Sequence, residues 1–176
     1  MRRLEREGLP VVATLVLSGL EAEFYQLSNL AEQIKALFSG VFGVRIDENK
    51  LEAACRQAQK LVRENYLLPE RADELVRTLG RGAWSVRYAA EEEAYYGKTP
   101  QETLFALKHL WASRWKVEAL LGRMPTLAPP ELPTLVQQTG EEPVQDADAS
   151  SAASKALGVS VDVWTCGGVI VHARSR

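Results

Sequence analysis

The stretch Ala83–Trp115, AWSVRYAAEEEAYYGKTPQETLFALKHLWASRW, says most about the fold of this chain. Its apolar beginning, residues 83–86, predicts a buried strand that places Arg87 at the strand's end. An acidic loop containing tyrosines follows, and then a helix with an aromatic stripe. A guanidinium is a permanent cation whose planar donors match phosphate and carboxylate groups. Arg87 is therefore a candidate anion-binding residue, and the plainer alternative is an ion pair with the acidic run Glu91–Glu93.

Working outward, the three- and four-residue spacing of apolar side chains predicts four helices. Their expected ranges are residues 19–39, 47–67, 69–79 and 99–121. Asp47 is a suitable N-cap for the second helix, and Pro69 is a suitable first residue for the third. In the fourth helix the apolar side chains nearly encircle the axis, which predicts a central position in the fold. Gly122 is expected to end this helix.

The remaining segments complete the prediction of an α+β fold. The apolar residues 9–17 predict a buried strand. Residues 123–155 are rich in Pro, Ala, Ser and acids, which predicts a linker, partly disordered and held to the core near residues 132–136. Alternation on both sides of a glycine turn in residues 156–176 predicts a C-terminal β-hairpin that returns to the domain. The expected architecture is thus a helix-rich domain, residues 1–122, packed on a small mixed or antiparallel sheet.

Composition excludes several classes of function. With 176 residues, of which 46% are hydrophobic, the chain is long enough to bury a core. A net charge of −2 lacks the basic excess that is typical of nucleic-acid-binding proteins. Cys55 and Cys166 lie far apart and the chain has 2 His, so no metal site is expected. The N-terminal apolar stretch is too short for a membrane span or a secretory signal, so we expect a cytoplasmic protein without membrane insertion.

Short segments in the first part of the chain carry a resemblance to a known family. They are Gly8-Leu9-Pro10-Val11, Ala13–Leu17, Ser85-Val86-Arg87, Ala89-Ala90, Gly97 and Trp111-Ala112-Ser113. In this order they resemble the N-terminal nucleotide-binding domain of phosphoenolpyruvate synthases and pyruvate phosphate dikinases, over about residues 5–121. The resemblance implies the first subdomain of an ATP-grasp-like fold, with ATP and magnesium as the cofactor. It also implies that Arg87 and Lys98 contact the nucleotide or its phosphates, Lys98 standing where the family has glutamine.

The departures from that family pattern bear on catalysis. Tyr88 and Ala89 stand where the family has two serines, so hydroxyl groups that could contact phosphate are missing. The family's glycine-rich segment with its lysine has no counterpart here, and nothing matches the second subdomain with its metal-binding acids. Phosphoryl transfer needs cations on the phosphates and carboxylates on the metal. We therefore expect no catalytic residue, no metal ligand and no autonomous kinase activity, and activity as an ATP-dependent phosphotransferase together with other domains or chains is left open.

Two hypotheses follow. In the first, the chain is a truncated, degenerate relative of the dikinase nucleotide-binding domain that retains nucleotide or phosphate binding through Arg87. In the second, the same fold serves as a non-catalytic interaction or assembly module. The candidate interaction surface is then formed by Tyr88, Tyr95 and Tyr96, together with the tryptophan helix, and it contacts a protein partner or a second copy of the chain.

Overall fold

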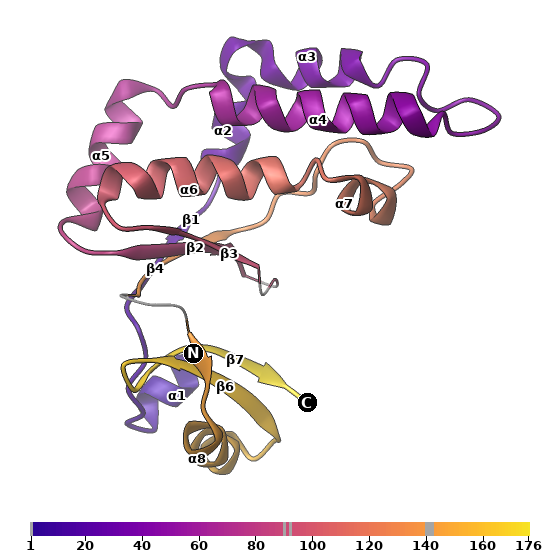
Figure 1. Cartoon of the computed structure of the whole chain (residues 1–176). Helices are drawn as coiled ribbons and strands as arrows, with labels where there is room; N and C mark the ends of the chain where they lie inside the picture. The colour runs from indigo at the N-terminus through magenta and orange to yellow at the C-terminus, as the bar shows by residue number, and fades with distance from the viewer. Residues whose placement is uncertain (1, 90, 92, 140–142) are drawn as a thin grey trace.

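The computed structural model describes residues 2–89, 91, 93–139 and 143–176 and shows a mixed α+β chain with two small antiparallel sheets. Figure 1 shows two units, one above the other. The larger unit stacks helices on one face of a four-stranded sheet. The smaller unit combines a three-stranded sheet with the first and last helices. Each unit has its own cluster of buried apolar side chains.

The sheet of the larger unit has the order β1-β4-β2-β3, and all neighbouring strands run antiparallel. Its strands are β1 (Thr14–Leu17), β2 (Trp84–Tyr88), β3 (Ala94–Gly97) and β4 (Thr134–Gln138). In β2, Trp84, Val86 and Tyr88 belong to the helix-covered core. Because side chains alternate along a strand, Ser85 and Arg87 face the opposite side, toward the smaller unit. The sheet therefore separates an apolar face from a polar one.

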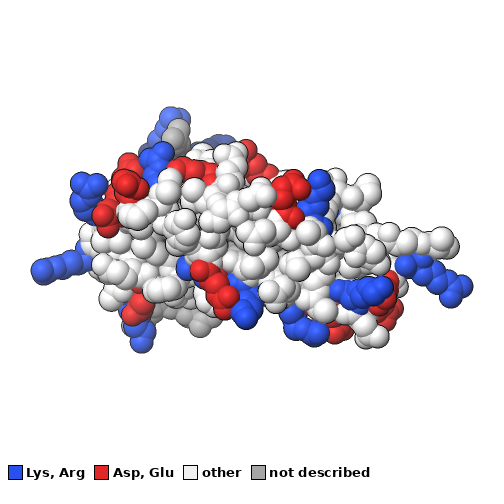
Figure 2. All heavy atoms as spheres, turned by 90° about the horizontal axis from the view of Figure 1, so that it is seen from above, with Lys and Arg blue, Asp and Glu red and all other residues white. Residues whose placement is uncertain are grey.

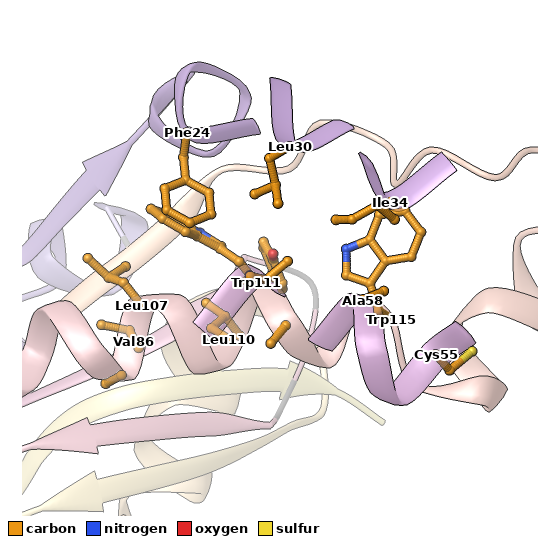
Figure 3. Close-up of a cluster of buried hydrophobic side chains, with 14 of the residues drawn as sticks. Phe24, Leu30, Ile34, Cys55, Ala58, Val86, Leu107, Leu110, Trp111 and Trp115 are labelled. Carbon is orange, nitrogen blue, oxygen red and sulfur yellow. The ribbon is translucent and has the colours of Figure 1, made fainter. Parts of the chain in front are cut away.

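Helices cover the apolar face of this sheet in two layers (Figure 1). They are α2 (Leu20–Gln26), the 3-10 turn η1 (Leu27–Asn29), α3 (Leu30–Leu37), α4 (Glu48–Glu64), α5 (Pro69–Leu79), α6 (Pro100–Ser113) and α7 (Val117–Gly122). The helix α6 lies directly on β2 and β3. Its Trp111 is fully buried and packs 4.9 Å from the ring of Phe24, between centroids. Figure 3 shows both rings within the cluster that joins α2, α4, α6 and β2.

Two of the predicted helices are interrupted, which corrects the sequence-based boundaries. The expected helix 19–39 breaks at Ser28 and Asn29, whose φ angles of 54° and 55° are left-handed. The expected helix 99–121 stops at Ser113 and resumes at Val117. The Ser113 hydroxyl donates to the Leu110 carbonyl at 2.7 Å, a local bond that competes with continuation of the helix.

The segment expected as a partly disordered linker, residues 123–155, instead contributes two strands and most of a helix. It contains the strand β4, which lies between β1 and β2, the short strand β5 (Val144–Gln145) and the helix α8 (Ala147–Leu157) up to residue 155. The expected buried strand 9–17 is also shorter than predicted, because only Thr14–Leu17 form a regular strand, at the edge of the sheet and with exposed or half-buried side chains. Val11 instead makes an isolated parallel bridge to Ile170 of the smaller unit. A central strand with few large apolar residues is possible because its Gln137 is buried with its hydrogen bonds satisfied.

The smaller unit is built from both ends of the described chain. Its elements are α1 (Arg2–Arg6), β5 (Val144–Gln145), α8, β6 (Val161–Cys166) and β7 (Val169–Ser175). The sheet order is β5-β6-β7, and β6 pairs with β7 across Gly167 and Gly168, both at positive φ. Its core joins Leu4 of α1 to Ile170 of β7. The C-terminal strands therefore complete a second core rather than returning to the first.

The helix lengths and the surface charges relate to two expectations from the sequence, that the chain does not insert into a membrane and does not bind nucleic acid. No helix in the described ranges is long and apolar enough to cross a bilayer. Figure 2 views the α3 and α4 side and shows acidic and basic side chains interspersed, without a gathering of one sign on this face. That pattern differs from the basic stripe that contacts a phosphate backbone.

Candidate functional site

A pocket of about 180 Å³ lies between the polar face of the large sheet and the small sheet. It is lined by Ser85, Arg87, Ala94, Tyr96, Gln137, Pro143, Trp164, Val171 and His172. The register of the large sheet explains the first wall, because Ser85 lies opposite both Gln137 and Tyr96 on neighbouring strands. Residues from distant parts of the chain thus meet at the seam between the two units.

Arg87 is the charged residue of this wall and is only 6% exposed. Its Nε donates to the Gln137 side-chain oxygen at 3.2 Å, and its Nη2 donates to the Val171 carbonyl at 3.4 Å. Its Nη1 donates to the carbonyls of Tyr88 and Glu91, at 3.3 and 3.5 Å. The guanidinium is therefore fixed at the end of β2, where the sequence places it, and it links the two units through Val171.

Among the described residues, the acceptors of Arg87 are all neutral oxygens and supply no counter-charge. Among the described residues no carboxylate oxygen lies within 4.0 Å of the guanidinium, so the ion pair with the run Glu91–Glu93 is not formed by Glu91 or Glu93. Burial lowers the pKa of Arg87 from its usual value, although an arginine remains protonated in proteins. A buried charge without a counter-ion is unfavourable, so a bound anion would stabilise this site.

The opposite wall of the pocket is aromatic. Trp164 of β6 and His172 of β7 lie opposite each other in register, with ring centroids 5.2 Å apart. Tyr96, which is 45% exposed, stands at the margin on the side of the large sheet. Aromatic faces and a buried guanidinium are the usual components of a site for a small anionic ligand.

The other predicted site residues are spread over different places. Lys98 is exposed and follows Gly97, which pairs with Trp84 at the far end of β2 from Arg87. Its backbone amide donates to the Glu102 carboxylate at the start of α6, at 2.8 Å. The structure therefore does not bring Lys98 to the Arg87 pocket.

The proposed tyrosine surface is not formed as predicted. Tyr88 is fully buried, which corrects its assignment to an exposed surface, because strand alternation turns it toward the helices with Val86. Tyr95 is partly buried and donates to the Glu93 carboxylate at 2.8 Å. Only Tyr96 of the three is largely exposed.

Three residues that line the pocket were missed by sequence reasoning. Gln137 lies in the segment expected to be a linker, and Trp164 and His172 were read only as parts of a hairpin. The amide of Gln137 donates to the Thr14 hydroxyl and to the Val171 carbonyl, both at 3.0 Å. The alternation of side chains along β6 and β7 could have placed Trp164 and His172 on one face of the hairpin. No pattern in the neighbouring sequence indicates that this face meets Arg87.

The residues present do not fit the magnesium ion that accompanies ATP in the resemblance. In the part of the chain that the structure describes, no three His, Cys, Asp or Glu side chains gather at a place that could hold a metal ion. Of the acidic run, Glu92 lies outside the described residues, and Glu93 is engaged by Lys116 at 2.6 Å.

A second polar cluster lies inside the larger unit, around Glu21 of α2. The Tyr88 hydroxyl donates to one oxygen of the Glu21 carboxylate at 2.9 Å, while the other oxygen is covered and has no donor among the described residues. Burial is the main cause that raises the pKa of Glu21 to about 7, against opposing effects of the Tyr88 bond and the Arg114 charge. Glu21 is therefore a carboxyl that titrates near neutrality.

This titration predicts that the protein loses stability as the pH rises. Between pH 4.5 and about 7 the unfolded chain releases the Glu21 proton while the folded chain keeps it, so the free energy of unfolding falls by up to about 3 kcal/mol. The substitution Glu21→Gln keeps an acceptor for Tyr88 and removes the charge. We expect this variant to be more stable than wild type by about 1–3 kcal/mol at pH 8, and to lack that advantage at pH 4.5.

Urea unfolding at the two pH values measures this difference. The control is Glu32→Gln, since Glu32 forms only an exposed pair with Lys35 and its loss should change stability by less than about 0.5 kcal/mol at either pH. Equal pH dependence in wild type and Glu21→Gln would contradict the assignment.

Comparison with known proteins adds no family to this picture. No family model matches the sequence, and no curated protein matches it significantly. The kinship with the dikinase nucleotide-binding domain accordingly stays a hypothesis, and the functional argument depends on the geometry of the Arg87 pocket.

Proposed function

We propose that the chain binds a small phosphate-bearing ligand in the pocket between the two sheets, with Arg87 as the residue that holds the phosphate. The observation that carries this proposal is a buried guanidinium at a pocket wall whose acceptors, among the described residues, are neutral oxygens. Ser85 is buried beside it and adds a hydroxyl to the same wall. We also propose that the chain is a truncated, degenerate relative of the dikinase nucleotide-binding domain, as the sequence resemblance implies.

The size of the pocket limits what enters it. Drug-sized ligands occupy pockets of roughly 300–1,000 Å³, whereas this one measures about 180 Å³. The phosphate group is therefore expected to bind inside. Any base or sugar of a nucleotide would extend past Tyr96, which stands exposed at the margin.

The residues of the pocket favour binding of a phosphate group without its transfer to another molecule. Transfer requires several cations on the phosphates and carboxylates that hold magnesium. The pocket supplies one arginine, and Lys98 lies at the other end of the strand pair. We expect the chain alone to have no kinase activity.

The alternative function, an interaction module, loses part of its proposed surface, while Tyr96 remains exposed. Tyr88, Trp111 and Trp115 are all buried in the core of the larger unit. They stabilise the fold and are not available to a partner.

The test is a titration with inorganic phosphate at constant ionic strength, read by calorimetry and by thermal unfolding. Phosphate at a hundredfold excess over its dissociation constant should stabilise the wild type by about 2.7 kcal/mol. Arg87→Lys should weaken phosphate binding about tenfold or more, because the planar fork is lost, and Arg87→Met should abolish it. ATP should bind equally well with and without magnesium.

The matched control is Arg45→Met, which removes an exposed arginine outside the pocket. It should leave phosphate binding unchanged. Absence of saturable phosphate binding in the wild type would refute the proposal, and unchanged binding in a folded Arg87→Met variant would refute the role of this residue.

A further inference from the structure

A second pocket, of about 410 Å³, lies on the larger unit and has no part in the phosphate proposal. It opens where α6 ends, beside α7 and the segment that leads to β4. Arg114 and Arg123 line it together with Glu91 and Glu118, and its wall also carries Lys116 and Glu93, which form an ion pair with each other at 2.6 Å. In the part of the chain that the structure describes, each of the two arginines keeps one Nη atom without an acceptor.

Arg114 is the more buried of the pair, with 6% of its surface exposed. Its guanidinium lies over the Tyr88 ring, 4.6 Å from the centroid. Its Nη2 donates to the Pro130 carbonyl at 2.7 Å. Its Nη1 is covered by protein and has no acceptor among the described residues. A buried charged donor without a partner is among the most unfavourable groups in a protein interior.

Arg123 repeats this pattern next to it. Its guanidinium lies over the Trp115 ring, 4.9 Å from the centroid. Its Nε donates to the Leu127 carbonyl at 3.0 Å, and its Nη1 donates to the Arg114 carbonyl. Its Nη2 is covered and lacks an acceptor in the described part of the chain. Burial, and after it the Arg114 charge, lowers the pKa of Arg123. The Nη1 contact with the Arg114 carbonyl and the shared pocket wall bring the two residues together.

Two guanidiniums that line one pocket, each over an aromatic ring and each with one Nη atom lacking an acceptor among the described residues, have the donors that an oxyanion needs. No carboxylate of the described residues lies within 4.0 Å of either group. The pocket wall also carries Glu91 and Glu118, which disfavour a doubly charged phosphate and favour a ligand with a positive group beside its anion.

We propose that the Arg114–Arg123 pocket binds the carboxylate of a zwitterionic small molecule of the α-amino acid class. The ligand carboxylate lies against the two guanidiniums, and its ammonium group lies toward Glu91 and Glu118. Arg123 is less buried than Arg114, and it turns its free Nη2 toward the ligand on binding. The size of the pocket leaves room for a side chain.

The experiment screens the common L-amino acids individually by thermal unfolding of the full chain. At a hundredfold excess over its dissociation constant, a binding amino acid should raise the melting temperature by about 5–10 °C. Its amide, its decarboxylated amine and its deaminated acid are then tested at the same concentration. We expect each of the three analogues to bind at least about tenfold more weakly, because each loses one charged contact.

Two variants locate the site. Arg123→Gln should weaken amino acid binding about ten- to hundredfold without changing phosphate binding at Arg87, and Arg87→Met should show the reverse. Arg56→Gln, on the exposed face of α4, is the matched control and should change neither. The proposal is overturned if no amino acid binds, if the deaminated acid binds as well as its parent, or if Arg123→Gln leaves affinity unchanged.

Discussion

The substitution Trp111→Ala should destabilise the larger unit by about 3–5 kcal/mol, a large part of the stability of an average domain. Trp111 is fully buried between the sheet and the outer helices, and its ring packs against Phe24 (Figure 3). Removing it leaves a cavity that several elements border, and rigid elements cannot collapse to fill such a space. Denaturant unfolding followed by far-ultraviolet circular dichroism measures the loss.

Two further variants separate packing from other effects. Trp111→Phe keeps an aromatic ring and removes an indole N–H that has no acceptor among the described residues, so its loss should be only about 1–2 kcal/mol. Phe105→Ala on the same helix removes a side chain that is 60% exposed, and its loss should stay within about 0.5 kcal/mol. Similar losses in Trp111→Ala and Phe105→Ala would show that α6 is not the central helix.

Gly97→Ala should cost about 3 kcal/mol or more, although it adds a single methyl group. A Cβ atom at this position would lie 2.7 Å from the Glu102 carbonyl carbon and closer still to the amide nitrogen of Thr103. These are backbone atoms of the first turn of α6, so no side chain can move aside. Either β3 must separate from β2 or α6 must shift off the sheet.

The control for this variant is Gly122→Ala at the end of α7, where an added Cβ meets nothing within 4 Å. It should be neutral or slightly stabilising, because alanine has the better helix propensity. Thermal unfolding of both variants gives the comparison. A Gly97→Ala protein as stable as the wild type would mean that β3 and α6 are not as close as the structure shows.

The parts of the fold that sequence predicts well are those decided by neighbours along the chain. Asp47 accepts from the Lys50 amide at 3.1 Å and begins α4, and Pro69 begins α5, both as expected. Capping and proline geometry act within one turn, so a single sequence contains the necessary information. The break at Ser28 and Asn29 is not visible in this way, since the apolar spacing continues across it.

The parts that sequence misses depend on partners far away in the chain. The strand β4 reads as a linker because it has few large apolar side chains, and its Gln137 can be buried because Arg87, Thr14 and Val171 satisfy its amide group. For Arg87, the sequence predicts the residue and its place at the end of a strand. Its contact with the Val171 carbonyl joins residues 84 positions apart, which no local pattern reveals.

The shared core of Leu4 and Ile170 has a consequence for biosynthesis. During translation the larger unit is complete once Gln138 has emerged, whereas α1 still lacks β6 and β7. At a synthesis rate of about 5–20 residues per second, the strands β6 and β7 leave the ribosome on the order of ten seconds after Leu4. Closing so long a loop is a late and slow event, and until then the apolar face of α1 is open to chaperones and to other nascent chains.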